Sequence, residues 1–60
     1  MTTMNKLESK NGVELFEIVM KINERETKTI SYEIYMDGEY LSRYHNEKQA
    51  RSMWKDFSGC

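Results

Sequence analysis

Few side chains of this 60-residue chain could take part in chemistry, and they stand apart in the sequence. His45 is the only histidine and Cys60, at the last position, is the only cysteine. These two ligands fall short of any structural zinc set, and a single cysteine cannot form a disulfide within the chain. An enzyme needs a nucleophile, a base or a metal within mutual reach, and the sequence predicts no such group. We therefore expect a non-enzymatic protein without a cofactor or metal.

The glycines and the histidine have structural explanations. Gly12, Gly38 and Gly59 are far apart, so no glycine-rich phosphate loop is expected. His45 directly precedes the predicted N-terminus of a helix. We interpret it as a surface residue or a helix staple, and Cys60 as an exposed free thiol.

Composition indicates an ordered, globular chain whose stability is marginal. Hydrophobic residues make up 38% and charged residues 32%, proline is absent, and the net charge is −1. Such a charge provides no long-range attraction for nucleic acid or an anionic membrane. The polar start of the chain does not resemble a signal peptide, and no segment is apolar over a membrane's thickness. We expect a cytoplasmic protein, in the host cytoplasm if a phage encodes it, and a need for self-association or a partner.

The apolar periodicity predicts three strands after a flexible N-terminal arm at residues 1–12. Residues 13–23 (VELFEIVMKIN) alternate but are apolar on both sides, which favours a strand, although a helical spacing also fits. Residues 29–36 alternate more cleanly. Asp37 and Gly38 then predict a type I′ hairpin turn into a third strand at residues 39–44, with Tyr35 opposite Tyr40 and Ile34 opposite Leu41.

The last element is a helix. Asn46 followed by Gln49 fits a capping box, in which each side chain meets the other residue's backbone. Apolar residues then recur at helical spacing: Ala50, Met53, Trp54 and Phe57. Gly59 fits a stop signal. The sequence therefore predicts an α+β fold, a three-stranded antiparallel β-meander with one C-terminal helix packed on one face, in a single β-β-β-α domain at residues 13–58.

One helix can cover only one face of this sheet, so the other face should remain open. We expect the helix to cover the larger apolar set: Phe16, Ile18, Met20, Ile22, Ile30, Tyr32, Ile34, Met36 and Leu41. The open face should then carry the partner-binding residues: Val13, Leu15, Val19, Tyr35 and Tyr40. Clustered apolar residues with two tyrosines indicate a protein interface, either with a protein target or with a second copy in a homodimer, although the exposed side of an antiparallel sheet can look the same.

Nucleic-acid binding is the alternative. The stretch from Ile30 to Phe57, a strand, an Asp-Gly turn, a strand ending in Arg43-Tyr44-His45 and a helix, resembles the sheet-plus-helix DNA-binding domains of plant ethylene-response factors and integrase arm-binding modules. The resemblance covers about half the chain and implies a sheet laid in the major groove. The expected open face, however, offers Glu17 and Glu33 and only Lys21 as a cation, whereas phosphate contacts require positive charge.

The preferred hypothesis is therefore a small protein-binding module. By analogy of size and style, it would be a phage or mobile-element accessory protein that inhibits or modulates a host protein by surface occupation, in host takeover or anti-defence. The alternative is a sheet-type DNA-binding regulator of the excisionase or repressor kind.

Overall fold

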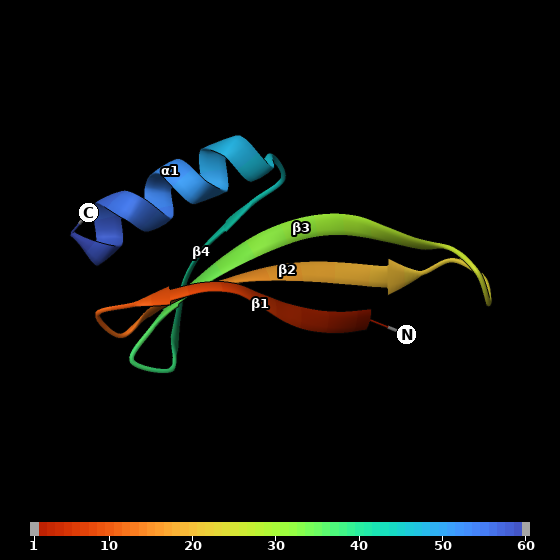
Figure 1. Ribbon diagram of the computed structural model, residues 1–60, viewed down its shortest axis with the longest axis horizontal. Coiled ribbons are helices and arrows are strands. Elements are labelled where there is room, and N and C mark those ends of the chain that lie inside the picture. The colour runs from red at the N-terminus through yellow and green to blue at the C-terminus, as the bar shows by residue number, and fades with distance from the viewer. Residues whose placement is uncertain (1, 60) are drawn as a thin grey trace.

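The computed structural model describes residues 2–59, which form a four-stranded antiparallel sheet followed by one helix (Figure 1). The elements are β1 (Thr2–Lys10), β2 (Val13–Lys21), β3 (Thr27–Met36), β4 (Glu39–Tyr44) and α1 (Glu47–Ser58). The strand order is β1-β2-β3-β4, a meander in which each strand pairs with its neighbour in sequence. The predicted α+β class, antiparallel sheet and C-terminal helix are confirmed, but the sheet has four strands and not three.

The additional strand is β1, formed by residues that the sequence assigned to an arm. Asn11 and Gly12 have φ angles of 53° and 79°. Two consecutive residues with positive φ are what a type I′ turn requires, and this turn folds β1 back on β2 with Lys10 opposite Val13. The arm prediction for residues 2–10 is therefore corrected to an edge strand, while Met1 lies outside the described residues.

The second tight hairpin joins β3 and β4 as predicted. Asp37 and Gly38 have φ angles of 52° and 84°, and Tyr35 lies opposite Tyr40. The predicted pairing of Ile34 with Leu41 is wrong, because the register shifts by one residue and places Ser42 opposite Ile34. A bulge of this kind adds one residue to one strand and increases its twist.

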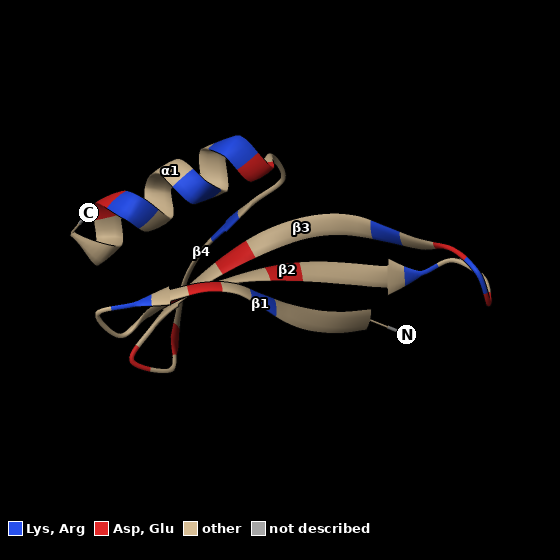
Figure 2. Cartoon of the chain, viewed as in Figure 1, with Lys and Arg blue, Asp and Glu red and all other residues tan. Residues whose placement is uncertain are grey.

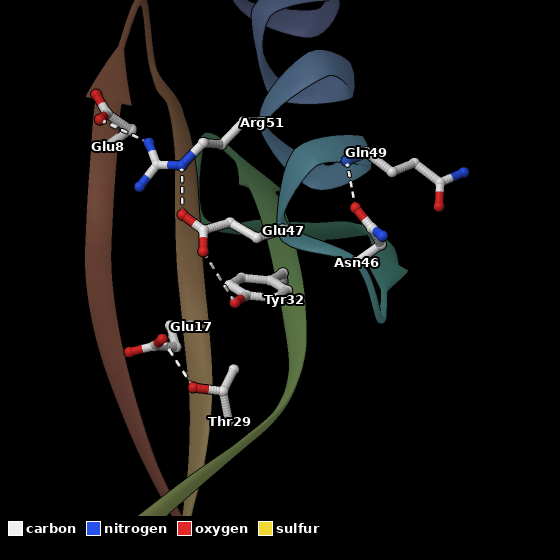
Figure 3. A network of polar contacts seen from close by, with 8 residues as sticks. All are labelled: Glu8, Glu17, Thr29, Tyr32, Asn46, Glu47, Gln49 and Arg51. Carbon is white, nitrogen blue, oxygen red and sulfur yellow. Dashed lines mark hydrogen bonds and ion pairs between the residues drawn. The ribbon is translucent and has the colours of Figure 1, made fainter.

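The helix begins and ends where the sequence indicated. The Asn46 side chain accepts a hydrogen bond of 3.1 Å from the backbone N–H of Gln49, and Gly59 ends the helix in the left-handed region with φ of 80°. The Gln49 side chain points away from Asn46 (Figure 3), so the reciprocal half of the predicted capping box is not formed.

The core lies between α1 and the half of the sheet nearest the two hairpin turns. Its buried apolar members are Val13, Leu15, Tyr32, Ile34, Ala50 and Trp54. The Trp54 indole Nε1–H donates a buried hydrogen bond of 3.0 Å to the carbonyl oxygen of Val13, which ties the helix to β2. The far half of the sheet, with the loop between β2 and β3, extends beyond the helix (Figure 1). The Cα trace accordingly measures 38 × 21 × 14 Å.

Candidate interaction surface

The strand pairing defines which side chains lie on the face of the sheet that α1 leaves uncovered, here called the open face. Directly opposed residues share a face and neighbours along a strand alternate, and the bulges add one residue. Leu15 lies under the helix, so Phe16 and its cross-strand partners lie on the other side. Extending this alternation gives the open face: Thr2, Met4, Lys6, Ser9, Glu14, Phe16, Ile18, Met20, Lys28, Ser31, Glu33, Tyr35, Tyr40 and Arg43.

Only part of the predicted binding set lies on this face. Val13 and Leu15 are 1% and 0% exposed and belong to the core under α1, so their placement on the open face is wrong. Val19 is half-buried and lies on the side of the sheet that α1 packs against. Tyr35 and Tyr40 do lie on the open face, next to each other.

The sequence-based prediction assigned the two sides of β2 to the wrong faces of the sheet. Residues of this strand that were expected under the helix, Phe16, Ile18 and Met20, lie on the open face instead. Both alternating sets of β2 are apolar, so periodicity alone does not say which set the helix covers. Met4 was missed because β1 was missed. The Asn11-Gly12 dipeptide carried the signal, since Asn-Gly is a preferred type I′ turn.

Three aromatic rings lie side by side on the open face, at the end of the sheet near the β3–β4 turn. The rings of Phe16 and Tyr35 meet edge to face, with centroids 5.3 Å apart at 85°, and Tyr35 and Tyr40 are 5.8 Å apart at 56°. We call these three residues the aromatic cluster. Ile18 and Met20 continue the apolar surface along β2 toward the far end of the sheet. Tyr40 and Met20 are 53% and 40% exposed, so both ends of this surface are accessible.

Four charged groups beside the aromatic cluster form ion pairs with one another. Lys6 Nζ lies 2.6 Å from Glu14 Oε2, and Arg43 Nη2 lies 3.2 Å from Glu33 Oε2. The Tyr35 hydroxyl donates a 2.9 Å hydrogen bond to Glu33 Oε1, and this bond to a carboxylate raises the pKa of Tyr35 above its ordinary value. The Glu33 side chain is only 11% exposed, so its neighbours largely shield its charge from water.

The opposite side of the sheet carries a polar network that fastens the helix (Figure 3). Arg51 donates through Nη1 to Glu8 Oε1 at 3.0 Å and through Nε to Glu47 Oε2 at 2.9 Å, and these bonds raise its pKa. Glu47 Oε1 accepts a longer bond of 3.4 Å from the Tyr32 hydroxyl. Burial, and then the Glu47 carboxylate, raise the pKa of Tyr32. This network joins α1 to β1 and β3, and it brings no nucleophile next to a base.

The other candidate features are sparse. Within residues 2–59 there is no detected pocket and no cluster of three or more His, Cys, Asp or Glu side chains that could hold a metal ion. No helix among these residues has the length and apolarity to cross a membrane. His45 is exposed between β4 and α1, and Cys60 lies outside the described residues.

Basic and acidic residues are interspersed along the chain and do not form a block of one sign (Figure 2). The open face, with its aromatic cluster and its paired charges, is therefore the candidate interaction surface. Comparisons of the chain with protein-family models, with curated proteins and with solved structures find no match.

Proposed function

We propose that this protein is a small, non-enzymatic protein-binding module whose working surface is the open face. The observation that carries the proposal is the aromatic cluster, which continues into the aliphatic side chains of β2 and which no element of residues 2–59 covers. Aromatic residues and methionine are enriched at protein interfaces, and tyrosine buries a large area at low conformational-entropy cost. The small size fits an accessory protein of a phage or mobile element that inhibits a host protein by covering part of its surface.

The charges beside the aromatic cluster favour a protein partner. A cation that already pairs with a carboxylate must give up that pair before it can neutralise a phosphate. Lys6 and Arg43 are both in this position, 2.6 and 3.2 Å from Glu14 and Glu33. The sheet-type DNA-binding role, which stays the alternative, therefore has less support from this face.

Photo-crosslinking tests the proposal in the cells that naturally make the chain. A photoreactive phenylalanine analogue replaces Tyr40, which is exposed on the open face, and a matched control carries it at Lys48, which is exposed on the helix. We expect a defined protein adduct from position 40 and none of the same mass from position 48. An absence of protein adducts at position 40 would reject the proposal, and so would the same adduct from both positions.

A DNA titration separates the two candidate functions. Purified protein is titrated with duplex DNA at low and moderate salt. Protein binding through a face whose cations beside the aromatic cluster are already paired predicts no salt-sensitive association with DNA. Binding that weakens steeply as salt rises would favour the DNA-binding alternative.

A further inference from the structure

We infer that the open face is covered by a second copy of this chain, so that the free protein is a face-to-face dimer. The two sheets would pack about 10 Å apart with both helices outside, as in an α/β/β/α sandwich. This inference rests on the proposed function, because it names the partner of the same surface. It also makes the dimer a resting state in which each copy shields the other copy's binding face.

The charge arrangement fits self-association. In a two-fold symmetric contact a surface meets itself, so an unpaired charge near the axis would face an identical charge. The ionised groups beside the aromatic cluster avoid this, because each is already paired within its own chain: Lys6 with Glu14, and Arg43 with Glu33. The apolar side chains of β2 and the aromatic cluster are then left to meet near the axis. Lys28, the remaining charged residue of the open face, lies opposite Met20 at the far end of the sheet.

The area is sufficient for a dimer of modest affinity. A nine-residue strand is about 30 Å long and four strands span roughly 15–19 Å, so each open face offers roughly 500 Å². Two faces would bury about 1,000 Å², close to the lower limit for a biological interface. Interfaces of this size are typical of weak or transient complexes, so we expect a dissociation constant on the order of micromolar.

The sheet edges are poorer sites for self-association. The two edge strands, β1 and β4, each carry a register shift, one between Lys6 and Glu8 and one between Tyr40 and Ser42. Such bulges interrupt the regular row of free N–H and C=O groups that an added strand needs, and they are a common protection against edge pairing. Face-to-face packing uses the apolar surface and leaves the edges as they are.

Sedimentation velocity from low to high micromolar concentration tests the inference. Met20→Asp places a charge on the open face, and Phe57→Asp is the matched control on the helix, since the two native side chains are 40% and 37% exposed. We expect wild type and Phe57→Asp to pass from monomer to dimer as concentration rises. Lys28 lies directly opposite residue 20 on the same face, so the new carboxylate could pair with it only if both charges were taken out of water. Met20→Asp should therefore weaken dimerisation at least tenfold.

Three outcomes would overturn the inference. They are a wild-type protein that stays monomeric throughout, a dimer that Met20→Asp leaves unchanged, and a dimer that Phe57→Asp weakens as much as Met20→Asp does. Tyr40→Asp, at the other end of the face and 53% exposed, repeats the test if Met20→Asp does not fold. A monomeric wild type that still forms an adduct with a different protein from position 40 would end the dimer hypothesis and leave the proposed function standing.

Discussion

Truncating Leu15 and Ile18 one at a time tests which face of β2 the helix covers. Leu15 is fully buried under α1, whereas Ile18 is half-buried on the open face. Leu15→Ala should cost about 3–5 kcal/mol, because the lost transfer free energy adds to that of the cavity left behind. Ile18→Ala should cost about 1 kcal/mol, roughly half the value for a fully buried aliphatic side chain.

The difference is large compared with the whole stability of the domain. A chain of this length is expected to have an unfolding free energy of roughly 3–9 kcal/mol, so Leu15→Ala should remove between about a third and all of it. Urea unfolding is followed by the fluorescence of Trp54, which is 7% exposed in the core, at a concentration that keeps the chain monomeric. If Ile18→Ala proved as costly as Leu15→Ala, or if Leu15→Ala cost under 1 kcal/mol, the reasoning about the two faces would be refuted.

Two further predictions concern the helix cap and the tyrosines. Asn46→Ala should lower the unfolding free energy in urea by about 1 kcal/mol, because it removes the acceptor of the Gln49 N–H. Gln49→Ala keeps that backbone N–H and should change the unfolding free energy by under about 0.5 kcal/mol. Equal losses in the two variants would contradict this cap. The pKa values of Tyr32 and Tyr35 are raised above the ordinary 10.0, so their contribution to stability should be complete below pH 10.0 and lost as the pH rises through the raised values. In an NMR titration of the tyrosine rings, Glu33→Gln should lower the pKa of Tyr35 toward 10.0 and leave the pKa of Tyr32 unchanged as an internal control. An unchanged pKa of Tyr35 would show that the Glu33 carboxylate is not the cause of its shift.

The sequence predicts well where local chemistry is decisive. Asp37 and Gly38 specify one turn conformation whatever surrounds them, and Asn46 and Gly59 mark the ends of the helix in the same local way. These assignments are confirmed because positive φ and an unsatisfied backbone N–H are properties of a few adjacent residues.

The sequence predicts the structure poorly where contacts between residues far apart in the chain are decisive. Strand β1 buries little apolar surface, so its sequence lacks the alternation of apolar and polar residues that identifies a half-buried strand. It is held instead by backbone pairing with β2 and by the ion pair between Glu8 and Arg51. Whether Leu15 or Phe16 is buried depends on which face of β2 the helix packs against. The contacts that fasten the helix there, such as the Trp54 hydrogen bond to the Val13 carbonyl, join residues 41 positions apart in sequence. The two tyrosines were placed correctly because they follow directly from the hairpin register.

The meander has a consequence for how the chain folds. Every strand pairs with its neighbour in sequence, and the first and last connections of the sheet are two-residue turns, so most of the ladder can close without long loops. This matters for β2, whose run of apolar side chains has the composition of an aggregation-prone segment while it is unpaired. Pairing on both sides by adjacent strands shortens the time for which this segment is exposed to other chains.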